Sequence, residues 1–135
     1  MAQKITLGHK VLVDAAKREI ETIPTEEAVK LHGNKDVVFV DIRDIRELQR
    51  EGRIPGAFHA PRGMLEFWID PASQYFKPIF GEDKKFVFFC AGAQRSALAT
   101  KTAQDMGLKP VAHLAGGFGA WRKAGGPVEV VEKKK

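Results

Sequence analysis

Cysteine is scarce in this 135-residue chain, which contains only Cys90. A single cysteine excludes an internal disulfide and a Cys-x-x-Cys metal or redox pair, so a cytoplasmic location is the default expectation. The chain lacks any apolar stretch near the roughly 20 residues that a membrane-spanning helix needs. Its first residues also lack the apolar core of a signal peptide. We therefore expect no membrane association.

Metal-binding and nucleic-acid-binding patterns are missing as well. None of the histidines, which are His9, His32, His59 and His113, lies one helical turn from another, the spacing that is typical of a metal site. None has an evident partner for general-base chemistry. There is no zinc-finger spacing and no basic stretch interleaved with aromatic residues. We expect no metal, no cofactor and no nucleic-acid partner.

The length of the chain is that of one domain. Apolar residues at helical spacing predict a helix from about Lys10 to Glu21. We interpret residues 1–22 as an N-terminal helical extension and residues 23–131 as the main domain. The formal net charge is +5, and part of this charge comes from the lysines at the end of the chain. We interpret residues 132–135 as a disordered basic tail. The remaining positive charge favours small anionic substrates.

Strand and helix patterns alternate along the main domain. The apolar runs typical of buried strands are residues 37–40, 86–89 and 111–114, and residues 57–60 fit a short edge strand. Helices are expected at residues 25–31 with Thr25 as N-cap, at 44–50, at 96–106 and after 116–117, with one or two short helices within 61–81. The alternation indicates a mainly parallel sheet, in which ligands bind beyond the carboxyl ends of the strands.

Cys90 lies at such a carboxyl end. It follows the apolar run directly and precedes a loop of small residues, after which a helical pattern begins near Arg95. Backbone N–H groups of the loop and the positive end of the helix can surround the sulfur, which favours the reactive thiolate. The alternative is that Cys90 is a small buried hydrophobic residue, the commonest role of a lone cysteine. Asp41 and Arg43 follow the neighbouring predicted strand and are expected at the same edge of the sheet.

Three segments of the sequence resemble the motifs of the single-domain rhodaneses, a family of sulfurtransferases. They are Val40-Asp41-Ile42-Arg43 with Glu47 and Gly52-Arg53-Ile54-Pro55-Gly56-Ala57, then Cys90-Ala91-Gly92-Ala93-Gln94-Arg95-Ser96, and finally Leu114-Ala115-Gly116-Gly117-Phe118-Gly119-Ala120-Trp121 with Gly126-Pro127. The resemblance covers roughly residues 23–130. It implies a rhodanese-like α/β fold of three layers, α/β/α, with a mainly parallel five-stranded sheet.

The resemblance also implies a reaction and a site. The Cys90 thiolate would take the outer sulfur of a small anionic donor such as thiosulfate, forming a persulfide. An external acceptor, which is cyanide, a thiol or a sulfur-acceptor protein, would then remove that sulfur, because no second thiol is present in the chain. The residues that would surround the sulfur and the anion are Ala91, Gly92, Ala93, Gln94, Arg95 and Ser96. Arg95 would either orient the donor or pair with Asp41 or another carboxylate.

The other expected site residues have supporting positions. Asp41 and Arg43 would brace the loop, and the pocket wall would include His59, Phe67 or Trp68. One departure from the family pattern is Ala93, since many members have glycine there. If that position requires a positive φ, alanine costs about 1 kcal/mol.

Two other classes of function remain open. One is a phosphatase or arsenate reductase for small oxyanions, although related phosphate loops have five residues between cysteine and arginine and this chain has four. The other is a noncatalytic interaction module on the same fold, because a fold alone does not establish chemistry. The oligomeric state does not follow from the sequence.

Overall fold

The strands form one sheet in which all neighbours are parallel. The structure is a computed structural model that describes residues 2–132. The strands are β1 (Glu21–Ile23), β2 (Val37–Asp41), β3 (Phe58–His59), β4 (Lys85–Phe89) and β5 (Val111–Leu114). Their order across the sheet is β1-β5-β4-β2-β3. Asp41 pairs with Phe89, so β2 and β4 end side by side and place Cys90 next to the chain that follows Asp41.

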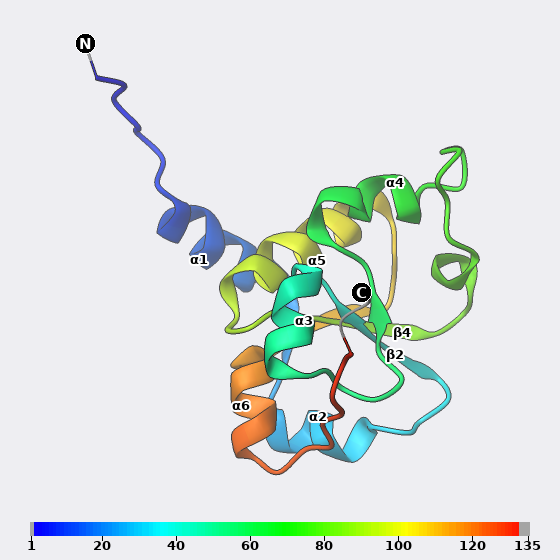
Figure 1. Cartoon of the computed structure of the whole chain (residues 1–135). Helices are drawn as coiled ribbons and strands as arrows, with labels where there is room; N and C mark the ends of the chain where they lie inside the picture. The colour runs from blue at the N-terminus through cyan, green and yellow to red at the C-terminus, as the bar shows by residue number, and fades with distance from the viewer. Residues whose placement is uncertain (1, 133–135) are drawn as a thin grey trace.

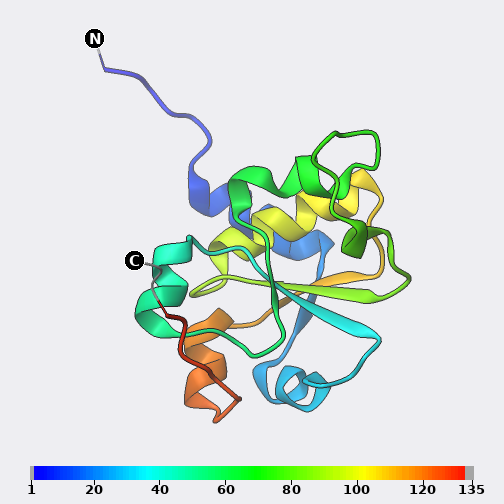
Figure 2. The same cartoon turned by 45° about the vertical axis from the view of Figure 1, so that its right-hand side comes forward.

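Helices cover both faces of the sheet, as alternating side chains along the strands require. On one face Val40 and Phe88 pack with α4 (Leu65–Ile69) and α5 (Gln94–Met106). On the other, side chains of the intervening strand positions pack with α2 (Thr25–Leu31) and α6 (Gly117–Lys123). Figure 1 and Figure 2 show α4 and α5 above the sheet and α2 and α6 below it. The predicted three-layer α/β/α fold with a five-stranded sheet is confirmed.

The aromatic segment between β3 and β4 contributes to the core of the first face. It contains the 3-10 helices η1 (Arg62–Met64) and η2 (Pro78–Gly81) around α4. The rings of Phe80 and Phe86 stack with centroids 5.5 Å apart, and Phe58 meets Phe80 edge-on at 5.7 Å. Most of the large apolar side chains in this segment therefore serve packing.

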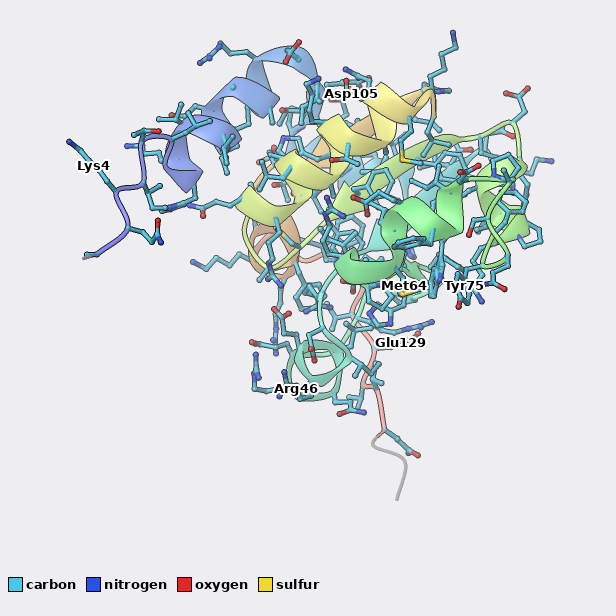
Figure 3. The ribbon with its side chains drawn as sticks, turned by 90° about the horizontal axis from the view of Figure 1, so that it is seen from above. Lys4, Arg46, Met64, Tyr75, Asp105 and Glu129 are labelled. Atoms are coloured by element: carbon cyan, nitrogen blue, oxygen red, sulfur yellow. The ribbon has the colours of Figure 1, made fainter. Side chains whose placement is uncertain are left out.

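The N-terminal helix α1 (His9–Glu19) lies along α5. Val13 and Ala16 pack against Ala97, and the side-chain amide of Gln104 donates to the carbonyl of Glu19 at 2.8 Å. The chain ahead of α1 extends away from the domain, with Lys4 well separated from the body in Figure 3. The helix is shorter than predicted because the chain turns extended at Ile20, and the three residues that follow form β1.

The structure corrects the predicted cap of α2. Thr25 is already the first residue of the helix, after Pro24, and no side chain caps this end. The Thr25 hydroxyl instead donates to the carbonyl of Ala115, 2.9 Å away, and so ties α2 to the chain that leaves β5.

The last predicted feature, the tail at 132–135, lies outside the described residues except for its first position. Within residues 2–132 no helix is both long enough and apolar enough to cross a membrane.

Candidate active site

Cys90 lies at the bottom of a small cavity beyond the carboxyl end of β4. Its side chain is buried, with 1% of its surface exposed. The backbone N–H of Ser96, in the first turn of α5, donates to the Cys90 sulfur at 3.4 Å. The cavity has a volume of about 320 Å³ and is lined by Cys90, Gly92, Ala93, Gln94 and Arg95. The buried sulfur thus combines a polar donor behind it with an opening in front of it.

The backbone at Ala93 accepts a side chain without strain. Its φ is −142°, and no residue other than glycine has a positive φ among residues 2–132. The departure from glycine at this position therefore adds no conformational cost.

Arg95 is held by Glu47 of α3 (Ile45–Glu51). Its two terminal nitrogens donate to the two carboxylate oxygens at 2.8 and 2.9 Å. The hydrogen bond from Arg95 is the main reason that the pKa of Glu47 falls to about 2, so the carboxylate is ionised at neutral pH. The same pairing raises the pKa of Arg95, with a smaller contribution from Cys90. The carboxylate that pairs with Arg95 is Glu47 rather than Asp41.

The start of α3 fixes the position of Glu47. Asp44 caps this helix by accepting from the N–H of Arg46 at 2.8 Å, and the N–H of Asp44 donates to Glu47 at 3.0 Å. This reciprocal arrangement is a capping box. The sequence signal for it, Asp44-x-x-Glu47, is present, but Glu47 was not among the predicted site residues.

Asp41 and Arg43 form a buried ion pair beside the site. Arg43 donates to the two oxygens of Asp41 at 2.8 and 3.0 Å, and both side chains are 1% exposed. The second acceptor of Arg43 is the carbonyl of Gly52 at 2.9 Å, and its guanidinium lies 4.2 Å from the ring centroid of Phe118. The pair therefore connects the end of β2 to α3 and α6. No hydrogen bond joins it to the 91–96 loop within the described residues.

The N-terminal turn of α6 holds the cysteine loop from below. The N–H of Phe118 donates to the carbonyl of Cys90 at 2.8 Å, and the N–H of Gly119 donates to Ala91 at 3.1 Å. Gly117 has a φ of +61°, and a Cβ there would collide with the carbonyl oxygen of Gly92. Only glycine allows the helix to approach the loop so closely. Sequence reasoning recognised the Gly116-Gly117 motif without assigning it this role.

The three residues predicted for the pocket wall lie outside the cavity lining. His59 is within hydrogen-bond distance of the carbonyl of Arg43, at 2.7 Å. Phe67 is exposed and meets Tyr75 edge-on at 6.4 Å, while the Trp68 ring lies beneath the ammonium of Lys77 at 4.7 Å. Figure 3 shows Tyr75 well away from α3, which carries Arg46.

The fold and the site together define a parallel α/β protein with a buried cysteine in a short loop between a strand and a helix. The model of the rhodanese-like domain matches residues 24–124. The chain belongs to the rhodanese-like domain family, and the family resemblance seen in the sequence is confirmed.

Individual relatives carry different descriptions. The structure of a Rhodopseudomonas palustris protein, described as a possible tyrosine phosphatase, is 67% identical with a TM-score of 0.93 and covers 96% of this chain and 99% of that chain. The mouse thiosulfate sulfurtransferase/rhodanese-like domain-containing protein 3 is 28% identical to this chain over the matched region. That region covers 70% of this chain and 64% of the length of the mouse protein. The dual specificity phosphatase Cdc25 of Arabidopsis thaliana is 28% identical over 84% of this chain and 81% of its own length.

Proposed function

We propose that this chain is a sulfurtransferase that carries a sulfane sulfur as a persulfide on Cys90. The observation that carries the proposal is the position of the Cys90 sulfur, which is buried beneath a small cavity and accepts the N–H of Ser96. A helix N-terminus and an aimed amide N–H stabilise an anionic sulfur. The shared family with the mouse sulfurtransferase-like protein supports the same activity.

The reaction would proceed in two displacements at sulfur. The Cys90 thiolate, whose proton has gone to solvent, attacks the outer sulfur of thiosulfate. A sulfur–sulfur bond forms to Cys90, the donor's sulfur–sulfur bond breaks, and sulfite leaves with the electron pair. A thiolate or cyanide then attacks the outer sulfur of the persulfide, and the Cys90 thiolate leaves. The acceptor must be external because Cys90 is the only thiol in the chain.

A phosphatase is the second candidate, because the R. palustris protein and the Arabidopsis relative carry that description. Two features favour sulfur over phosphate. Four residues separate Cys90 from Arg95, which gives a smaller loop than the five-residue phosphate loops have. Arg95 also has two of its N–H groups committed to Glu47, which leaves fewer donors for a tetrahedral oxyanion.

The intact mass of the protein after incubation with thiosulfate tests the proposal, with Cys90→Ala as the control. We expect a gain of one sulfur atom that cyanide removes and that the variant lacks. Hydrolysis of a simple aryl phosphate by the wild type, lost in Cys90→Ala and without any sulfur uptake, would overturn the proposal in favour of a phosphatase. Absence of both activities, also with a thiosulfonate or a persulfide as donor, would overturn it in favour of a noncatalytic interaction module.

A further inference from the structure

A chain of hydrogen bonds runs from the Cys90 sulfur through the buried residues Ser96 and His113 to Thr22, an exposed residue of β1. Ser96, whose N–H faces the sulfur at 3.4 Å, has its hydroxyl 3.2 Å from Nδ1 of His113. The other ring nitrogen, Nε2, lies 2.9 Å from the hydroxyl of Thr22. The register of the sheet places Thr22 directly beside His113, so β1 and β5 bring the last two partners together. The consecutive elements β4, α5 and β5 and the distant strand β1 therefore all contribute to this chain of hydrogen bonds.

His113 is a neutral member of this chain. The side chains of Ser96 and His113 are both buried, and burial, with a smaller contribution from Lys17, lowers the pKa of His113 to about 4. A neutral imidazole has one N–H donor and one acceptor nitrogen, and a hydroxyl serves in either role. One hydroxyl therefore donates to His113 and the other accepts from it, and both ring nitrogens are used.

The N–H of Ser96 depends on outside support for its direction. Ser96 is the third residue of α5, so its N–H belongs to the first turn and has no acceptor within the helix. Ala93 at the N-cap supplies no side-chain cap. The bond between the Ser96 hydroxyl and His113 ties this turn to β5 of the sheet. The packing of Ala97 against α1 adds apolar support on the next residue.

We propose that His113 is a positioning residue, which holds Ser96 so that its N–H points at the sulfur carried by Cys90. Its hydrogen-bonding role is to fix the amide that stabilises the thiolate and, on the basis of the proposed function, the persulfide. Thr22 completes the arrangement by fixing the imidazole from the far side. At metal sites, substitution of a residue that orients a metal ligand typically lowers affinity or activity by about tenfold or more, and we expect an effect of similar size here.

The experiment compares His113→Gln, Ser96→Ala and their double variant with the wild type. The first readout is the rate at which iodoacetamide alkylates Cys90 in the native protein, followed by intact mass, which requires no sulfur-transfer activity. The second is the rate of sulfur uptake from thiosulfate. We expect each single variant to lower both rates about tenfold, with the KM for thiosulfate unchanged. The double variant should be no slower than the slower single variant, because the two residues act as one unit.

Of two further variants, His32→Gln is the control and Thr22→Val tests the far partner of His113. The ring of His32 is also within hydrogen-bond distance of a backbone carbonyl, that of Pro55 at 2.8 Å, but His32 does not line the cysteine cavity. His32→Gln should therefore leave both rates unchanged. Thr22→Val keeps His113 and removes only its far partner, and it should lower the rates about twofold to threefold. Stability is measured for every variant by urea unfolding.

The outcomes separate this inference from the proposed function. Unchanged alkylation and sulfur-uptake rates in folded His113→Gln and Ser96→Ala would overturn the role of His113 while leaving the sulfurtransferase proposal intact. Multiplied losses in the double variant would also overturn it. If the wild type takes up no sulfur, the proposed function fails, and the alkylation rates still decide whether His113 positions Ser96.

Discussion

Glu47 and Arg95 join α3 to the cysteine loop through a two-armed ion pair, with nitrogen–oxygen distances of 2.8 and 2.9 Å. Glu47 is 18% exposed and Arg95 45%, so the pair lies at the rim of the cavity rather than in the core. The carboxylate cancels much of the positive charge that Arg95 would otherwise present to an anion. Glu47 is therefore expected to set how strongly the site attracts a doubly charged donor.

The first prediction concerns that charge. Glu47→Gln removes one negative charge from the rim, so we expect the KM for thiosulfate to fall several-fold and to become more sensitive to salt. Steady-state kinetics of sulfur transfer to cyanide at two ionic strengths measures the effect. The control is Glu51→Gln on the same helix, where an exposed carboxylate pairs with Arg50. An unchanged or raised KM in Glu47→Gln would show that the carboxylate positions Arg95 without tuning its charge.

The second prediction concerns the buried pair of Asp41 and Arg43. Arg43→Met leaves a carboxylate that is 1% exposed without its partner, so we expect a loss of about 3–5 kcal/mol in the free energy of unfolding. The control is Arg46→Met, which removes the exposed partner of Asp44 and should change the free energy of unfolding little. Urea unfolding of both variants compares them. Similar losses for the two would mean that the buried pair carries no special role in stability.

Much of the fold was predictable because its signals are local. The apolar runs that end at Asp41 and Cys90 identify buried parallel strands, and the spacing from Ser96 to Met106 with a following glycine identifies α5. The strand β1 was missed because its residues Glu21–Ile23 contain no apolar run. Its existence depends on pairing with β5, which lies far away in sequence.

In the candidate site, too, residues with a local sequence signal could be predicted and residues that depend on long-range contacts could not. Cys90, Arg95 and Ser96 were predicted as site residues from one contiguous stretch of sequence, and their functional roles stay predictions. The partners Glu47 and His113 were not assigned to the site, because the contacts that bring them there are made through the tertiary fold. Phe67 and Trp68 were predicted at the pocket wall from composition alone, and side-chain directions in an irregular segment do not follow from composition.

The third prediction is a pH dependence of stability. Folding lowers the pKa of His113 from 6.5 to about 4, so the unfolded chain takes up the proton first as the pH falls. The contribution of His113 to stability is complete above pH 6.5 and is lost progressively as the pH falls toward about 4. Urea unfolding across this range, in parallel with His113→Gln, isolates the effect because other titrating groups are common to both. The wild type should lose more stability than the variant, and parallel curves would contradict the buried neutral state.

The last prediction tests the contact between α6 and the cysteine loop. Gly117 has a φ of +61° and lies against the carbonyls of Cys90, Ala91 and Gly92, so Gly117→Ala adds both backbone strain and a collision with backbone atoms. Gly33 has a φ of +88° with no atom within 4 Å of an added Cβ, so Gly33→Ala carries the strain alone. We expect Gly33→Ala to cost about 1 kcal/mol and Gly117→Ala about 2–4 kcal/mol.

The difference between these two glycine variants measures the collision. Because the backbone that must move carries Cys90, Gly117→Ala should also slow sulfur uptake in the protein that remains folded, while Gly33→Ala should not. Both quantities come from urea unfolding and intact-mass kinetics on the same samples. Equal losses of stability, or an uptake rate in Gly117→Ala that matches the wild type, would mean that the loop accommodates the added methyl and that α6 does not hold the cysteine in place.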